Sequence, residues 1–105
     1  MTLQPTKARI PLPLAAIETL CRKWKVQELA LFGSVLREDF SSESDVDVLV
    51  TFDPDAPWSA WDLIKMQEEL EAALGRRVDL VERNALRNPF RRREILRSHQ
   101  VVYAA

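Results

Sequence analysis

The chain has 105 residues, of which 47% are hydrophobic and 30% charged, a composition typical of one globular domain with a single core. A formal net charge of −1 gives no general attraction to nucleic acid or to an anionic membrane, and a lone cysteine, Cys21, excludes an internal disulfide. Neither a signal peptide nor an apolar run long enough to span a bilayer is found, so we expect a cytoplasmic protein with no membrane partner.

The start of the chain predicts a tail followed by a helix. Residues 1–12 contain Pro5 and Pro11 and show no apolar period, so we expect an N-terminal tail, with one domain over residues 13–105. Pro13 is suited to open a helix. That helix has one apolar face, with members at helical spacing: Leu14, Ile17, Leu20, Cys21 and Trp24.

A strand, a turn and a second strand are expected next. Residues 28–32 form a short apolar run typical of a buried strand, and Gly33 can adopt the backbone conformation of a tight turn. A short helix should begin after Ser34, and a strand should follow over residues 45–52. Residues 53–57 contain two prolines and predict a loop.

The second half of the chain predicts two more helices and two more strands. Apolar positions at helical spacing favour a helix over residues 59–74, which Gly75 would cap. A strand at 77–81, a helix at about 89–97 and a short strand at 101–103 complete the chain. The predicted fold class is a small α/β (α+β) domain, with a mixed sheet and helices mainly on one face.

Two acidic residues on the strand at 45–52 indicate a metal site. Asp45 and Asp47 are one residue apart, so their side chains point to the same side of the strand while the valines between and beyond them point into the core. Two carboxylates in one small volume raise each other's pKa unless a cation neutralises them. Oxygen ligands suit Mg²⁺, which takes substrate phosphates among its other ligands.

The turn before this strand supplies groups that suit a phosphate. Gly33 lets a triphosphate approach the backbone closely, and Ser34 offers a hydroxyl and an amide. Ser34 could equally be a helix N-cap, and the two roles use the same geometry. Arg37 could fork onto phosphate oxygens or pair with a neighbouring carboxylate. A third acid, Asp79, lies on the apolar strand 77–81 and would complete a site for two divalent ions.

These residues resemble the signature of the minimal nucleotidyltransferases, the smallest members of the DNA polymerase beta-like superfamily. The resemblance covers about residues 28 to 103, with Gly33-Ser34, then Asp45-Val46-Asp47, then Asp79. It implies that the three aspartates bind Mg²⁺ and that Gly33 and Ser34 hold the phosphates of the nucleotide, which we expect to be ATP. Many relatives have a second glycine after the arginine of the turn, where this chain has Glu38.

The resemblance also implies a reaction and a partner. Relatives transfer a nucleoside monophosphate to a hydroxyl, and larger ones carry an added acceptor-binding domain for which this chain has no room. Minimal members are commonly encoded beside a HEPN ribonuclease toxin and act as its antitoxin by AMPylation of a toxin tyrosine. This is the leading hypothesis. The alternatives are a non-catalytic module that neutralises its partner by occlusion, which Glu38 keeps open, and transfer to RNA or a small molecule.

Other features favour structural roles. Arginines gather near the C-terminal end of the chain, and this cluster is a solvated face, a docking surface for an acidic protein or an RNA contact, although it lacks aromatic platforms for bases. Trp58 and Trp61 could stack on adenine but are expected to pack in the core. His99 is expected at the surface, and Cys21 is expected to be buried and inert.

Overall fold

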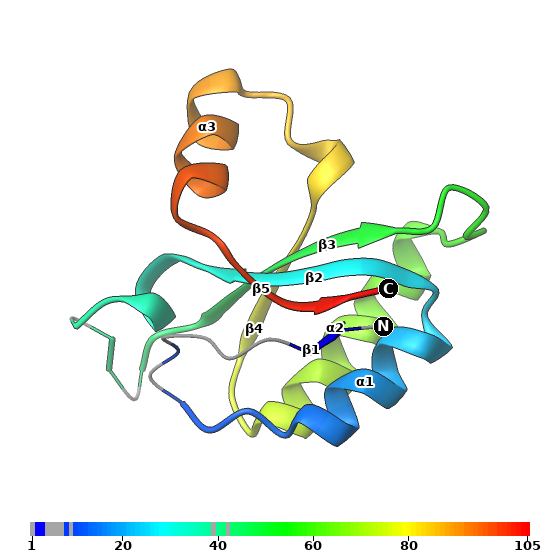
Figure 1. Cartoon of the computed structure of the whole chain (residues 1–105), viewed down its shortest axis with the longest axis horizontal. Coiled ribbons are helices and arrows are strands. Elements are labelled where there is room, and N and C mark those ends of the chain that lie inside the picture. Colours follow the sequence, from blue (N-terminus) through cyan, green and yellow to red (C-terminus); the bar gives the residue numbers. More distant parts are fainter. Residues whose placement is uncertain (1, 4–7, 9, 39, 42) are drawn as a thin grey trace.

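A five-stranded sheet with the strand order β1-β5-β2-β3-β4 organises the molecule (Figure 1). The computed structural model describes residues 2–3, 8, 10–38, 40–41 and 43–105. The strands are β1 (Thr2–Leu3), β2 (Val26–Phe32), β3 (Val46–Phe52), β4 (Val78–Glu82) and β5 (Gln100–Ala104). The α-helices are α1 (Leu14–Lys23), α2 (Ala60–Leu74) and α3 (Pro89–Ser98), and single 3₁₀ turns are η1 (Gly33–Leu36) and η2 (Arg83–Ala85).

The sheet is mixed, as predicted. β2 runs antiparallel to both of its neighbours, β3 and β5, whereas β3 and β4 are parallel. A parallel pair needs a crossover connection, which α2 supplies between β3 and β4. This crossover is what aligns the residues of β3 and β4 that carry acidic side chains.

Two of the three α-helices cover one face of the sheet. Side chains of α1 and α2 join one core cluster, whose members include Ile17, Cys21, Met66, Val48 and Val50. A second, smaller cluster lies on the opposite face and contains Ala30, Phe32, Leu49, Leu86 and Ile95, the last from α3. Figure 1 shows α3 standing on the side of the sheet away from α1 and α2. The expectation of helices mainly on one face is confirmed, and α3 leaves part of the other face uncovered.

Local sequence sets the ends of the helices. The backbone N–H and the hydroxyl of Ser59 both donate to Asp62 Oδ2, at 2.8 and 3.0 Å, which fixes the start of α2. Gly75 ends α2 with a φ of 67°, in the left-handed region that glycine tolerates. Asn88 caps α3 by accepting hydrogen bonds from the N–H groups of Phe90 and Arg91.

The described part of the N-terminal segment packs on the rest of the chain and adds an edge strand to the sheet. Thr2–Leu3 forms β1 and pairs antiparallel with β5, a strand that no periodicity in the sequence predicted. Further along, Ala8, Ile10 and Leu12 pack against the larger core cluster. The division into a tail and a domain at residue 13 stays a prediction. Among the described residues, no helix has the length and apolar character needed to cross a membrane.

Candidate active site

The predicted acids lie on the face of the sheet that α1 and α2 do not cover. Asp47 is level with Asp79 on the parallel neighbour β4 and with Phe32 on the antiparallel neighbour β2. Because adjacent strands are about 4.8 Å apart, level residues place their side chains next to each other. Val46 and Val48 point into the larger core, and neither is more than 1% exposed, so Asp47 between them points to the opposite face. The alternation read from the sequence is confirmed.

Gly33 lies directly against Asp47. Its φ is 75°, and a Cβ built on it would overlap Asp47 Oδ2, so both the backbone and the space require glycine here. The predicted short helix after the turn is a single 3₁₀ turn, η1. Val35 is fully buried and anchors η1 to the sheet, which leaves Ser34 half-buried beside the acids. The N-cap residue of η1 is Phe32 and Ser34 lies inside the turn, so the N-cap role of Ser34 is not realised.

The electrostatics of Asp47 are those of a carboxylate that needs a cation. Burial raises the pKa of Asp47, and the charges of Asp79 and Asp45 raise the pKa further. Arg37 and Arg91 oppose this shift and lower the pKa. The sequence predicted Arg37 as a site residue. It did not single out Arg91, because only the packing of α3 decides which arginine of the cluster faces the acids.

A cavity separates η1 from α3 beside these acids. Its volume is about 200 Å³, and its walls combine two cations, Arg37 and Arg91, and one carboxylate, Glu94, with the backbone of Gly33. Phe32 and Ile95 supply the apolar part of the wall. A larger cavity of about 530 Å³, bordered by Val26 and Asp53, lies at the other end of β2 and β3 and holds none of the acids. None of the three aspartates lines the smaller cavity either, but it adjoins the candidate site through Gly33, which lies against Asp47.

The three carboxylates are not gathered in one cluster. Asp45, just before β3, is half-exposed and forms an ion pair with Arg77, Nε to Oδ1 at 3.0 Å. In the described part of the chain, no three acidic, histidine or cysteine side chains stand ready as a metal site. Burial and the charges of Asp79 and Asp45 raise the pKa of Asp47, and this nevertheless fits a divalent cation at Asp47 and Asp79. The Arg77 guanidinium contacts one oxygen of Asp45 and would compete with a cation for that carboxylate.

Some of the remaining sequence predictions are confirmed and one is wrong. Cys21 is buried as expected, and burial raises its pKa to about 12. Trp58 packs on Trp24 with ring centroids 4.9 Å apart and donates from Nε1 to the Trp24 carbonyl at 2.7 Å. The expectation that Trp61 packs in the core is wrong: it is 79% exposed, because the first turn of α2 turns it away from the sheet. His99 is half-buried, with Nδ1 2.8 Å from the Leu96 carbonyl.

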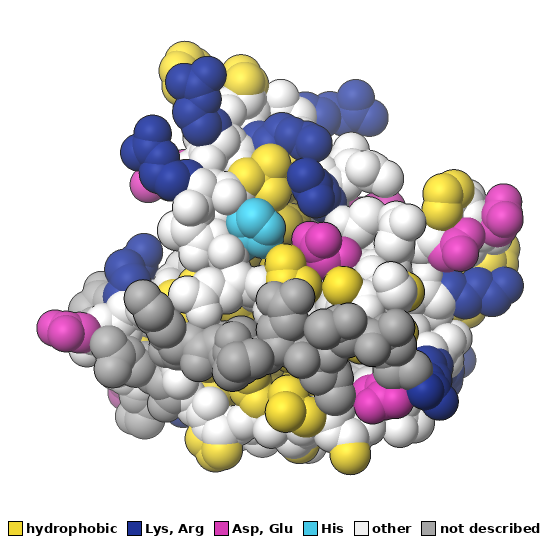
Figure 2. Space-filling model, in the orientation of Figure 1, with side chains coloured by type: hydrophobic (Ala, Val, Ile, Leu, Met, Phe, Trp, Pro, Cys, Tyr) yellow, Lys and Arg dark blue, Asp and Glu magenta, His cyan; other side chains and the backbone are white. Residues whose placement is uncertain are grey.

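The predicted arginine cluster forms an exposed basic surface over α3. In Figure 2 the dark blue side chains gather in the upper part of the molecule, around exposed hydrophobic atoms. Arg91, Arg93 and Arg97 are exposed along α3, and Phe90 at its start is 80% exposed. This surface borders the candidate site through Arg91.

Fold and site define a class of protein. A small α+β sheet with two level carboxylates beside a glycine turn is the arrangement expected of a domain that handles phosphate groups. Comparison with known proteins makes the class specific: the family model for the nucleotidyltransferase domain matches residues 15–102. The chain belongs to the nucleotidyltransferase domain family, and its reaction is the transfer of a nucleotide.

Individual relatives agree with this assignment. The chain is 40% identical over 84 residues to the protein adenylyltransferase MntA of Thermococcus cleftensis, with 80% of both chains covered. It shares its fold with a toxin–antitoxin crystal structure containing AMP-PNP, with a TM-score of 0.72, 22% identity and 90% and 75% of the two chains covered. A tri-AMPylated Shewanella oneidensis HEPN toxin in complex with MNT antitoxin gives a TM-score of 0.64 at 21% identity, covering 88% and 70%. At these identities the two structures establish the fold alone.

Proposed function

We propose that this chain transfers AMP from ATP to a tyrosine hydroxyl of a HEPN ribonuclease toxin and thereby acts as its antitoxin. The curated relative named above is a protein adenylyltransferase, and the structural neighbours come from toxin–antitoxin complexes. The observation that carries the catalytic part of the proposal is the level pair Asp47 and Asp79 beside Gly33. It places paired negative charge where a triphosphate can approach the backbone.

Asp45, Asp47 and Asp79 are the proposed ligands of Mg²⁺. The raised pKa of Asp47 and the carboxylate chemistry of the set support this assignment. When bound, two such ions would lower the pKa of the attacking hydroxyl and neutralise the leaving pyrophosphate. Asp79 is exposed, so it can reach an incoming acceptor, and we assign to it the proton that the hydroxyl releases.

The turn and the cavity supply the groups that hold the nucleotide. Gly33 brings the backbone of the turn against Asp47, and the half-buried Ser34 next to it is assigned to donate from its hydroxyl to the phosphates. Arg37 lines the cavity beside Gly33 and is assigned to the triphosphate. With phosphates and acceptor so held, the acceptor oxygen attacks the α-phosphorus, the bond to pyrophosphate breaks, and positioning supplies most of the rate.

The test follows the two ends of the triphosphate separately. The chain and its copurifying partner are incubated with Mg²⁺ and with ATP labelled at either the α- or the γ-phosphate. The proposal predicts label on the partner from the α-phosphate only. Label from the γ-phosphate would indicate phosphorylation. A stable complex without label would indicate occlusion, the alternative that Glu38 keeps open, although Glu38 is exposed at the far end of the turn.

A further inference from the structure

The segment that delivers Asp45 is a tight turn outside the sheet. The N–H of Ser44 donates to the Ser41 carbonyl at 3.1 Å, and the N–H of Ser41 donates to Ser44 Oγ at 3.2 Å. Asp45 follows this turn directly, and β3 begins one residue later at Val46. The position of the Asp45 carboxylate therefore depends on what holds the turn.

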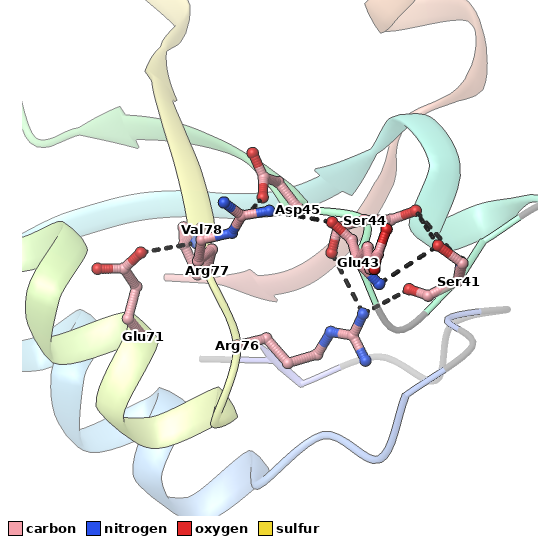
Figure 3. A network of polar contacts seen from close by, with 8 residues as sticks. All are labelled: Ser41, Glu43, Ser44, Asp45, Glu71, Arg76, Arg77 and Val78. Atoms are coloured by element: carbon pink, nitrogen blue, oxygen red, sulfur yellow. Dashed lines mark hydrogen bonds and ion pairs between the residues drawn. The ribbon is translucent and has the colours of Figure 1, made fainter.

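Arg76 holds the turn from the opposite side, immediately after the end of α2. Its Nη2 donates to two carbonyls of the turn, that of Ser41 at 2.6 Å and that of Ser44 at 3.2 Å (Figure 3). Its guanidinium also lies over the ring of Phe40, 4.4 Å from the centroid. Three contacts from one rigid, planar group fix the turn more firmly than a single hydrogen bond would.

Arg77, the next residue, contacts Asp45 itself. Its Nε lies 3.0 Å from Asp45 Oδ1, and its Nη2 donates to the Glu43 carbonyl at 3.1 Å (Figure 3). The backbone carbonyl of Arg77 accepts from the N–H of Val46 at 2.9 Å, so this arginine is anchored beside the start of β3. Arg77 thus contacts one of the two carboxylate oxygens of Asp45 and would compete with a cation for this carboxylate.

We infer that two adjacent arginines control the metal affinity of Asp45 in opposite directions. Arg76 is a positioning residue: it holds the backbone of the turn so that Asp45 keeps its place before β3, on the same side of the strand as Asp47. Arg77 is a competing counter-ion, which a divalent cation must displace from Asp45. The inference rests on the proposed function only in taking Asp45 as a metal ligand.

The test measures metal binding directly. Mn²⁺, a paramagnetic substitute for Mg²⁺, is titrated into the full chain without nucleotide, and free Mn²⁺ is followed by electron paramagnetic resonance. For Arg76→Ala we expect the Mn²⁺ Kd to rise about tenfold, the lower end of the effect of residues that support metal ligands. For Arg77→Ala we expect the Kd to fall, by up to about fivefold, because an exposed ion pair contributes little. Arg93→Ala, an exposed arginine on α3, is the matched control and should leave the Kd unchanged.

Two further variants distinguish the proposed role of Arg76 from a general loss of folding. Arg76→Lys keeps the charge but can reach only one carbonyl, so it should give an intermediate Kd. Phe40→Leu removes the ring beneath the guanidinium and should raise the Kd in the same direction as Arg76→Ala. In a transfer assay, Arg76→Ala should raise the Mg²⁺ concentration that gives half the maximal rate, while the KM for ATP changes much less. A general loss of structure would impair Mg²⁺ and ATP binding together.

The inference is overturned if Arg76→Ala and Arg77→Ala change the Kd in the same direction, or if neither differs from Arg93→Ala. Absence of saturable Mn²⁺ binding by the unaltered chain would overturn it at its premise. Opposed shifts in Kd without any AMP transfer would support the inference and reject the proposed function, so the two fail separately.

Discussion

The negative charge of Asp47 lowers the stability of the folded chain when no cation is bound. Its pKa is raised by burial first and then by Asp79 and Asp45, so the folded chain binds a proton at Asp47 more tightly than the unfolded chain does. The resulting loss of stability is absent below the ordinary carboxyl pKa of 3.8, grows as the pH rises toward the raised value, and is complete above it.

Asp47→Asn should therefore stabilise the metal-free chain while abolishing AMP transfer. The asparagine keeps the shape of the side chain but removes the repelled charge. We expect the Tm at neutral pH to rise by a few degrees, and the advantage over the unaltered chain to shrink as the pH falls toward 3.8. Thermal unfolding in a chelator at several pH values checks this, and a lower Tm for the variant at neutral pH would contradict it.

Gly33 and Gly75 illustrate two different reasons why a position in the chain requires glycine. Both have positive φ, but a Cβ at Gly33 would overlap Asp47, whereas a Cβ at Gly75 would meet nothing within 4 Å. Gly75→Ala should cost only the backbone penalty, about 1 kcal/mol of unfolding free energy, and should retain transfer. Gly33→Ala should cost about 2 kcal/mol or more and displace Asp47, with loss of transfer.

Urea denaturation and a transfer assay on the two glycine variants make this comparison. Equal losses of stability with equal retention of activity would show that Gly33 is needed only for its backbone conformation. Such a result would remove the argument that the turn is fitted to the carboxylate.

At the scale of elements, α3 contributes Arg91 to the site. Arg91 lowers the pKa of Asp47 and lines the cavity beside Gly33. We expect Arg91→Ala to raise the KM for ATP about tenfold, the effect of losing one hydrogen bond to a charged group, with a smaller change in kcat. Arg93→Ala, two residues along the same helix, should leave both constants unchanged. Steady-state kinetics of pyrophosphate release tests the pair, and equal effects would place the nucleotide away from α3.

The sequence was sufficient to predict those helices, strands and turns that depend on a local pattern of residues. Alternating valines around Asp47, the glycine at the turn and the cap at Gly75 are local signals, and the structure contains the strands and helices they predicted. The roles of Arg91 and Arg76 could not be predicted, because each depends on contacts between segments far apart in the chain. The same holds for β1, whose two residues form a strand only because β5 offers them an edge. Trp61 shows the converse, since large apolar side chains are usually buried but α2 turns this one outward.

At the scale of the whole molecule, one face of the sheet carries the stability and the other carries the site. The larger core lies under α1 and α2, while the acids and the turn occupy the opposite face, on which Leu86 and the α3 residue Ile95 pack. Ligand binding on the sparsely covered face should therefore be able to add stability without rearranging the main core.

Binding of MgATP should raise the Tm of the chain. At a ligand concentration of ten times Kd the folded state gains about 1.4 kcal/mol. A domain of this size shifts by about 4–8 °C per kcal/mol, so a rise of about 6–11 °C is expected. Asp79→Asn should reduce this rise by weakening the carboxylate pair. No shift at millimolar MgATP would favour a chain that acts by occlusion alone.

The central claim is that Asp47 and Asp79, beside Gly33, transfer AMP to a partner protein. The most direct test is the intact mass of the copurifying partner after incubation with ATP and Mg²⁺, using the unaltered chain and Asp47→Asn in parallel. We predict a gain of one or more AMP units with the unaltered chain and none with the variant. An unchanged partner mass in both samples, or the same gain in both, would contradict the claim.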